Sequence, residues 1–220
     1  MITLHYLNDS RAIRVLWMLE ELGVEYELKK YQRTKEMGAP KELKEANDTG
    51  KSPFLIDGEV KLAESGSIIE YLQQKYDTDN QFSYERGSSE WIDQVFWTHF
   101  AEASLMPPLV VALIFNMIDS KAPFPVTMLT KKIGDQVRSR FVTPSLKANA
   151  KLLEEGLGKH EWIAGSELTI ADFQLAYGAQ AMLDRGKLDL PNLKRWVKQV
   201  ESRPAYLRAI QKGGKVNMPM

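Results

Sequence analysis

The spacing of apolar residues changes near residue 80, and this change divides the chain into two parts that must fold differently. Residues 1–76 alternate short strand-like runs with helical runs, whereas residues 88–212 have helical spacing nearly throughout. The polar residues 77–88 between them fit a linker. We therefore expect an α/β N-terminal domain over residues 1–76 and an all-α domain over residues 89–220.

The N-terminal part predicts the element order β-α-β-α-β-β-α. Gly23 ends the first helix, and Asp57-Gly58 is a strong signal for a tight hairpin between two strands. A helix between two strands implies that they pair in parallel, whereas a hairpin pairs its strands antiparallel. The expected strands are residues 2–7, 25–31, 53–56 and 60–63, and the expected helices are residues 10–22, 42–46 and 65–76.

The second part predicts a bundle of helices, because its apolar residues recur at helical spacing and prolines stand at several expected helix starts. Two long helices come first. We expect the first to bend at Pro107-Pro108 and the second to break near Pro144. The expected helices are residues 91–118, 126–157, 169–184, 191–201 and 204–212.

The composition excludes several classes of chemistry. The 220 residues include no cysteine, which removes disulfides, thiolate nucleophiles and thiolate metal sites. His5, His99 and His160 are not spaced like metal ligands, so no metal site is expected. Lys and Arg together number 29, as do Asp and Glu, so the net charge is zero. A neutral chain gives no support for binding nucleic acid or anionic membranes.

No segment of the sequence carries a pattern that directs a protein into or across a membrane. Residues 1–6 lack the basic and apolar segments of a signal peptide. The longest apolar stretch, residues 105–115, contains Pro107 and Pro108 and is too short to span a bilayer. We expect a cytoplasmic protein without a membrane span.

Ser52-Pro53 stands at the start of an expected strand, where a proline cannot donate a hydrogen bond to a strand ladder. One interpretation of this pair is a plain edge strand. The other is a cis-proline turn that leaves the peptide groups of Ser52 open to pair with an extended peptide ligand.

Glu64-Ser65 stands where a strand ends and the next helix begins. One interpretation is N-capping by Ser65 or Ser67, with Glu70 completing a capping box from Ser67. The other is a site for an amino acid head group. Free N–H groups at a helix start favour a carboxylate, and Glu64 beside them would take the ammonium group.

Thr169 and Asp172 match a capping box, in which each side chain satisfies a backbone donor of the other. Leu168 and Phe173 occupy the positions of a hydrophobic staple around it. Such a cap contributes roughly 1 kcal/mol, so we expect this motif to be structural.

These motifs, taken in their order and spacing, make the whole chain resemble the cytosolic glutathione transferases. The motifs that carry the resemblance are the β-α-β-α-β-β-α order, Ser52-Pro53, Glu64-Ser65 and the Thr169…Asp172 box. Within that family the chain is most similar to the fungal Gtt-type enzymes and related bacterial ones. The segments that carry this closer similarity are residues 9–12, 62–66, 105–109 and 122–125.

The resemblance implies a thioredoxin-like N-terminal domain that binds glutathione and an all-helical C-terminal domain that helps bind an electrophile. By position, the backbone of Ser52 before Pro53 would hold the cysteinyl part of glutathione. Glu64 and Ser65 would hold its γ-glutamyl part. The interpretations of both motifs from their residues agree with these roles.

Lys51 is the expected partner of the glycine carboxylate of glutathione, with Lys41 and Arg33 as alternatives. Each of the three is equally well explained as a solvated surface cation. Glutathione would be a substrate, and no separate cofactor is expected.

Relatives use a serine or a tyrosine near the end of the first strand to hold the glutathione thiolate. A free thiol with a pKa of about 8.5 is mostly protonated at neutral pH, and a hydroxyl donor or a helix start lowers that pKa. Ser10, at the expected start of the first helix, combines both effects and is the expected catalytic residue. Tyr6 is the alternative, and backbone N–H groups alone are a third. Without such a role, Ser10 would be an N-cap and Tyr6 a core aromatic.

The resemblance therefore implies a glutathione transferase, active in detoxification, that attacks small hydrophobic electrophiles with the glutathione thiolate. Relatives are homodimers, and a homodimer is expected here. The electrophile pocket would lie between the domains, lined by side chains drawn from Tyr6, Phe100, Leu105, Met106, Leu109 and Phe115.

Two alternative functions stay open from the sequence. A glutathione-dependent peroxidase or disulfide reductase would use the same fold, and a non-catalytic protein would keep the fold for binding glutathione, another ligand or a partner protein. The absence of cysteine favours thiol addition or substitution over disulfide reduction. It does not exclude peroxidase activity, because the thiol belongs to glutathione.

Overall fold

A four-stranded mixed sheet organises the N-terminal part of the computed structural model, which describes residues 1–47, 49–185 and 188–217. The sheet has the order β2-β1-β3-β4. β1 pairs in parallel with β2 and antiparallel with β3, and β3 pairs antiparallel with β4, as the sequence predicted. The strands are β1 (Ile2–Leu7), β2 (Tyr26–Tyr31), β3 (Phe54–Asp57) and β4 (Val60–Ala63).

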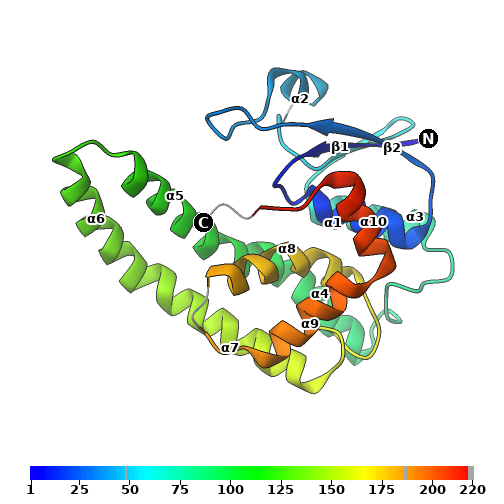
Figure 1. Ribbon diagram of the computed structural model, residues 1–220. Helices are drawn as coiled ribbons and strands as arrows, with labels where there is room; N and C mark the ends of the chain where they lie inside the picture. The colour runs from blue at the N-terminus through cyan, green and yellow to red at the C-terminus, as the bar shows by residue number, and fades with distance from the viewer. Residues whose placement is uncertain (48, 186–187, 218–220) are drawn as a thin grey trace.

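Three helices accompany the sheet: α1 (Ala12–Leu22), α2 (Lys41–Ala46) and α3 (Ser65–Tyr76). Gly23 ends α1 with a left-handed φ of 64°, and Gly58 turns the β3–β4 hairpin with a φ of 63°, both conformations that favour glycine. α1 and α3 pack together between the sheet and the helical domain (Figure 1). The expected thioredoxin-like domain with an all-helical partner is therefore confirmed.

The helical part is a bundle in which two long helical rods come first (Figure 1). Ser88 accepts a hydrogen bond from the N–H of Trp91, so the first rod begins two residues earlier than the apolar spacing predicted. The helices are α4 (Ser89–Phe100), α5 (Met106–Lys121), α6 (Val126–Val137), α7 (Thr143–Lys159), α8 (Ile170–Arg185), α9 (Pro191–Ser202) and α10 (Pro204–Gly213).

The prolines inside the two rods loosen the helix instead of breaking it. A π-helical turn, η1 (Ala101–Leu105), precedes Pro107-Pro108, and a second, η2 (Arg138–Val142), precedes Pro144. A proline has no N–H and crowds the carbonyl four residues before it, so the preceding turn widens. The expected break near Pro144 is thus a widened turn within a continuous rod.

The first rod, Ser89–Lys121, is long and apolar enough to cross a membrane by length and composition, with a mean hydropathy of 1.7 over its most apolar window. Core helices pass the same test. Leu105 and Leu109 of this rod are buried in the core of the helical domain. Only 33% of the most apolar window of the rod is buried, and one such helix among the described residues is weak evidence for a membrane span.

Aromatic side chains form one core across the domain boundary. The ring centroid of Trp17 on α1 lies 4.4 Å from that of Phe173 on α8 and 5.5 Å from that of Tyr206 on α10. Phe82, in the connection between the domains, packs edge-on against Phe173 at 5.4 Å. The two domains are therefore held in one arrangement by shared apolar packing.

Asp172 at the start of α8 departs from the expected capping box. Its carboxylate accepts the N–H of Thr169 at 2.9 Å, as predicted, but the hydroxyl of Thr169 donates to the same carboxylate. The other carboxylate oxygen accepts from the N–H of Ile163 and from Nε1 of Trp196. Burial raises the pKa of Asp172 to about 6, and these four hydrogen bonds oppose that rise. Only the Asp172 half of the box forms.

The last helix, α10, returns to pack against α1 of the thioredoxin-like domain (Figure 1). The buried carboxylate of Glu20 accepts from Nε of Arg208 at 2.8 Å and from Nζ of Lys212. Glu21 pairs with Arg203. The end of the chain therefore neutralises carboxylates near its beginning.

Candidate active site

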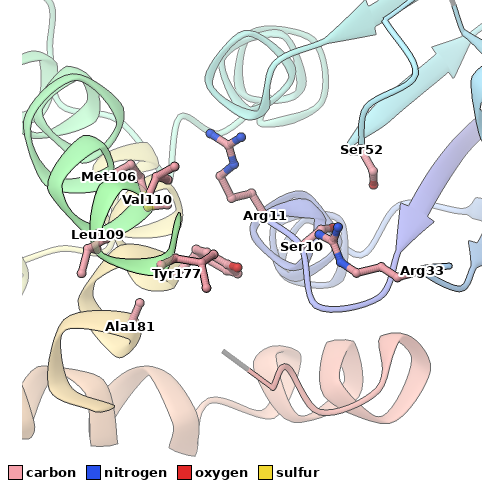
Figure 2. Close-up of a pocket in the computed structure, with 10 residues that line it drawn as sticks. Ser10, Arg11, Arg33, Ser52, Met106, Leu109, Val110, Tyr177 and Ala181 are labelled. Carbon is pink, nitrogen blue, oxygen red and sulfur yellow. The ribbon is translucent and has the colours of Figure 1, made fainter. Parts of the chain in front are cut away.

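A cleft of about 170 Å³ lies between the two domains, with walls of different character (Figure 2). The thioredoxin-like wall is polar and cationic, and the helical wall is mostly apolar. The first wall is formed by Ser10, Arg11, Arg33 and Ser52, and the second by Met106, Leu109, Val110, Leu113, Tyr177 and Ala181.

The Ser52–Pro53 peptide bond is cis, as the turn interpretation predicted. The hydroxyl of Ser52 accepts from the N–H of Leu7 at 2.9 Å and donates to the carbonyl of His5 at 3.0 Å, which ties the turn to the end of β1. The backbone N–H and C=O of Ser52 form no hydrogen bond with another described residue. These two groups are available to an extended ligand.

Glu64 and Ser65 line a second pocket, of about 490 Å³, at the start of α3. Glu64 is exposed and has a left-handed φ of 66°, which is rare for a side-chain-bearing residue and concentrates at ligand sites. Among the described residues no side chain caps α3, so the box from Ser67 to Glu70, which the capping interpretation required, does not form. The first-turn N–H groups of α3 therefore have no side-chain partner, and they can receive an anion.

Arg14 lies beneath this second pocket and is buried completely. Its Nη1 donates to Oγ of Ser65 at 3.2 Å and to Oε1 of Glu102, and its Nε and Nη2 atoms have no hydrogen-bond partner in the part of the chain that the structure describes. Burial lowers the pKa of Arg14, and the charge of Glu102 opposes that effect. Oε2 of Glu102 accepts from Arg11 at the edge of the cleft. Glu102 thus lines the second pocket and pairs with Arg11, which lines the cleft.

Ser10 caps the first turn of α1. Its hydroxyl donates to the carbonyl of Leu7 at 2.6 Å and accepts from the N–H of Ala12 at 3.2 Å. The backbone N–H groups of Ser10 and Arg11 form no hydrogen bond with a described residue. The start of α1 therefore offers two free N–H donors and a hydroxyl at the cleft.

Tyr6 does not line the cleft. Its side chain is 1% exposed and packs against α10 close to Gly213. Burial raises the pKa of its hydroxyl, and the nearby Tyr206 and Asp9 add to that rise. The Tyr6 hydroxyl therefore lies in the core of the protein and not at the surface of the cleft.

The three candidate cations differ in their surroundings. Arg33 lines the cleft and donates to the carbonyls of Asn8 and Asp9, which holds the β1–α1 loop in place. Lys51 is exposed beside the Ser52 turn and has no ion-pair partner among the described residues. Lys41 pairs on the surface with Glu45 at 3.4 Å.

Met106 and Leu109 are on the apolar wall of the cleft, whereas Phe100 and Leu105 are buried in the core and do not reach it. The wall also includes residues that the sequence analysis did not name: Arg11, Val110, Leu113, Tyr177 and Ala181. Val110 and Leu113 follow Met106 at the i+4 and i+7 spacing of one helical face, a signal that could have found them.

The described residues contain no group of three or more histidine, aspartate or glutamate side chains that could hold a metal ion. The polar groups of the two pockets are hydroxyls, guanidinium groups, carboxylates and free backbone N–H groups. Together they can hold a ligand that carries two carboxylates, an ammonium group and an extended peptide backbone.

A thioredoxin-like domain with a cis-proline turn, facing an all-helical domain across a cleft, defines a class of two-domain proteins. Family models described as the glutathione S-transferase N-terminal and C-terminal domains match residues 1–74 and 139–204. The chain is 33% identical over 214 residues to glutathione S-transferase 3 of Schizosaccharomyces pombe, covering 96% of this chain and 88% of that protein. The chain belongs to the glutathione S-transferase family.

Two further relatives agree with this assignment. Glutathione S-transferase 1 of Saccharomyces cerevisiae is 31% identical over 223 residues, covering 96% of this chain and 94% of that protein. A crystal structure of a glutathione S-transferase from Actinobacillus pleuropneumoniae superimposes with a TM-score of 0.81 at 35% identity. That match covers 99% of this chain and 95% of the other. The expected similarity to fungal and bacterial members of the family is confirmed.

Proposed function

We propose that the protein is a cytoplasmic glutathione transferase with a role in detoxification. It binds glutathione between its domains and uses the thiolate of glutathione to attack small hydrophobic electrophiles. The observation that carries this proposal is the set of unpartnered backbone groups around the cleft. They occur at Ser52, at the start of α1 and at the start of α3.

Glutathione can bind to these groups in one orientation, in which each of its three residues meets a different part of the site. The backbone of Ser52 pairs with the cysteinyl residue, as an added strand does. The first turn of α3 and the hydroxyl of Ser65 receive the γ-glutamyl carboxylate, and Glu64 receives the ammonium group. Lys51, which has no ion-pair partner among the described residues, reaches the glycine carboxylate.

The cysteinyl thiol then lies at the start of α1. The N–H groups of Ser10 and Arg11 and the positive end of the helix dipole favour the thiolate, which lowers the thiol pKa. The hydroxyl of Ser10 joins them by exchanging its hydrogen bond to Leu7 for one to sulfur. Ser10 is preferred to Tyr6 as the catalytic hydroxyl because Ser10 lines the cleft and Tyr6 does not.

The reaction follows from an activated thiolate beside an apolar wall. The sulfur electron pair forms a bond to an electrophilic carbon, and either a leaving group departs or a π electron pair moves onto the electrophile. Met106 and Leu109 contribute the apolar surface that holds the electrophile. No cofactor takes part, because glutathione supplies the nucleophile.

A homodimer is part of the proposal. Ile92 and Phe96 lie one turn apart on α4 and are 58% and 47% exposed, so they form an apolar surface on this helix. A second copy of the chain would cover them. Sedimentation equilibrium of the purified protein tests this part separately from the chemistry.

The decisive experiment is an ultraviolet titration of glutathione bound to the purified protein, which follows thiolate absorbance against pH. A bound thiol pKa lowered by about 2 units, equivalent to about 2.7 kcal/mol, supports the proposal. Binding with an unshifted pKa would leave a non-catalytic binding protein. Turnover of a hydroperoxide or a mixed disulfide, with no turnover of electrophiles, would move the assignment to a peroxidase or reductase.

A further inference from the structure

Gln174 on α8 carries a buried acceptor atom that the fold leaves without a partner. Its side chain is 1% exposed, and no described residue donates a hydrogen bond to its Oε1. Native proteins pair most of their buried polar groups, because an unpaired one costs free energy. Methionine, an unbranched apolar side chain of similar length, would fill this position without that cost. The amide is therefore explained by a donor that arrives with a ligand.

The amide of Gln174 lies at the second pocket, beside the start of α3. Gln174 lines this pocket together with Glu64, Ser65 and Gly66. Its Nε2 lies 3.5 Å from the position that a Cβ on Gly66 would take, so the amide stands next to the first turn of α3. A side chain of the helical domain thus reaches the helix start of the thioredoxin-like domain.

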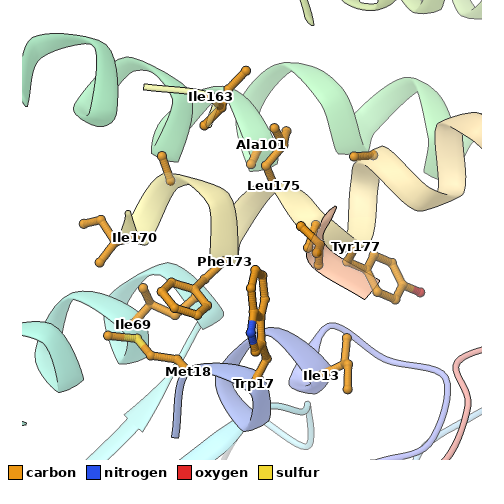
Figure 3. Close-up of a cluster of buried hydrophobic side chains, with 14 of the residues drawn as sticks. Ile13, Trp17, Met18, Ile69, Ala101, Ile163, Ile170, Phe173, Leu175 and Tyr177 are labelled. Atoms are coloured by element: carbon orange, nitrogen blue, oxygen red, sulfur yellow. The ribbon is translucent and has the colours of Figure 1, made fainter. Parts of the chain in front are cut away.

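The position of Gln174 is fixed by its two preceding neighbours in the first turn of α8. Asp172 accepts four hydrogen bonds there, from Thr169, Ile163 and Trp196. Phe173 packs against Trp17 of α1 across the domain boundary, as Figure 3 shows. The amide is therefore held in place before a ligand arrives, which lowers the entropic cost of binding.

The charges of this pocket suit a ligand group that is both positive and negative. Glu64 and Glu70 line it, and neither forms an ion pair with a described residue. Glu102 also lines it, but Arg14 and Arg11 balance its charge. The unpaired carboxylates favour a cation, while the first-turn N–H groups of α3 favour an anion. An α-amino acid head group carries both charges.

The chemistry of an amide oxygen decides which half of the head group Gln174 meets. Oε1 can only accept a hydrogen bond. A carboxylate has no proton to donate at neutral pH, whereas an ammonium group carries three N–H donors. Glu64 can take one of these donors and Gln174 another. The buried acceptor therefore matches the ammonium group and not the carboxylate.

We propose that Oε1 of Gln174 accepts a hydrogen bond from the α-ammonium group of the γ-glutamyl residue, and that the protein thereby selects thiol peptides whose α-amino group is free. This inference rests on the proposed binding of glutathione, and it adds a specificity-determining residue from the helical domain. A peptide without that amino group leaves Oε1 unpaired. Because a site built around a polar contact rejects a ligand that lacks the matching group, such a peptide binds more weakly.

The test compares the affinities of two ligands by isothermal titration calorimetry. One ligand is glutathione, and the other is glutaryl-cysteinylglycine, which is glutathione without its α-amino group. Gln174→Met removes the acceptor and keeps the length of the side chain, whereas Gln174→Glu keeps an acceptor oxygen. Gln180→Met is the matched control, because Gln180 is also on α8 but donates to Tyr206 and does not line this pocket.

We expect Gln174→Met to weaken the binding of glutathione by at least about tenfold, and to leave that of glutaryl-cysteinylglycine within about twofold of the wild type. A side chain that only supported the fold would affect both ligands alike. Gln174→Glu should bind glutathione at least as tightly as the wild type, and its preference for glutathione over the glutaryl peptide should increase. Gln180→Met should keep both affinities.

Four results would overturn the inference. They are equal affinities of the wild type for the two ligands, no effect of Gln174→Met on glutathione, equal losses of both ligands in Gln174→Met, and equal losses of both in Gln174→Glu. Equal losses in both variants would assign the amide to the carboxylate as a donor. If Gln174→Met does not fold, the ligand preference of Gln174→Glu decides. Failure of the glutathione proposal itself is recognised separately, because the wild-type protein would then bind neither ligand.

Discussion

Arg14 of the thioredoxin-like domain donates a hydrogen bond to Glu102 of the helical domain, which lines the pocket at the start of α3. The Arg14 side chain is fully buried, and that of Glu102 is 32% exposed. Glu102 also pairs with Arg11, so one carboxylate compensates two guanidinium groups of the opposite domain. The contact between the two domains and the pocket at the start of α3 therefore both depend on the Glu102 side chain.

Glu102→Gln should lower the free energy of unfolding by about 2 kcal/mol, because it leaves the buried Arg14 cation without its counter-charge. Urea denaturation followed by tryptophan fluorescence measures this loss. Glu155→Gln is the control, since Glu155 pairs with Lys151 at 3.7 Å on the exposed surface of α7. That change should cost under about 0.5 kcal/mol. Equal losses in the two variants would show that Glu102 does not compensate Arg14.

Ser10→Ala should reduce turnover about 100-fold, because it removes one donor to the thiolate. The dissociation constant of glutathione should stay within about twofold, since the γ-glutamyl and cysteinyl contacts lie elsewhere. Steady-state kinetics and titration with glutathione measure the two quantities. Tyr6→Phe is the matched variant and should leave turnover unchanged. If turnover survives Ser10→Ala and is lost in Tyr6→Phe, the assignment of Ser10 is wrong.

Glu64→Gln should weaken glutathione binding by about tenfold, or about 1.4 kcal/mol, because a neutral amide replaces the partner of the ammonium group. Isothermal titration calorimetry provides the affinity. Glu59→Gln, at an exposed position in the β3–β4 turn, is the control and should bind glutathione as the wild type does. Unchanged affinity in Glu64→Gln would show that the ammonium group of glutathione does not bind to the Glu64 carboxylate.

Asp57 at the end of β3 gives a pH dependence of stability. Burial would raise its pKa, but hydrogen bonds from Lys75, Tyr76 and Tyr71 of α3 outweigh burial and lower the pKa to about 2. In the unfolded chain an aspartate has a pKa of about 3.9. The unfolded state therefore binds a proton first as the pH falls. The stabilisation is complete above about pH 5 and is lost between about pH 4 and pH 2.

Asp57→Asn should accordingly differ most from the wild type in free energy of unfolding at neutral pH, and the difference should shrink towards pH 2. Urea denaturation at pH 7, 5 and 3 measures this trend. Asp79→Asn, an exposed change just after α3, is the control and should stay close to the wild type at each pH. A difference independent of pH in Asp57→Asn would mean that its carboxylate charge does not contribute.

The arrangement of the N-terminal domain could be predicted from local signals. Asp57-Gly58 fixed the antiparallel hairpin, and the helix between β1 and β2 fixed their parallel pairing. The site residues that came from such signals were those at turns and helix starts, Ser10 and Ser52 among them. The positions of these residues depend on the backbone conformation of a few neighbours in the chain. Local sequence signals such as glycine, proline and capping residues predict that conformation directly.

The helical wall of the cleft could not be predicted in the same way. The π-helical turn η1 adds a residue to one helical turn, so the face of the rod rotates between Phe100 and Met106. Leu105 therefore points into the core, where Gly178 leaves room for it, while Met106 reaches the cleft. Tyr177 lies on a helix that is apolar on nearly all sides, and no periodicity shows which side meets the other domain.

The return of α10 to α1 also affects how the protein can be made. The partners of Glu20 are Arg208 and Lys212, which lie 188 and 192 residues later in the chain. The partner of Glu21 is Arg203, which lies 182 residues later. On the ribosome, the first domain therefore emerges with carboxylates that have no counter-charge and with part of α1 uncovered. Its folding is completed only when the last helix is released. A premature stop codon before residue 203 would damage the domain that was synthesised first.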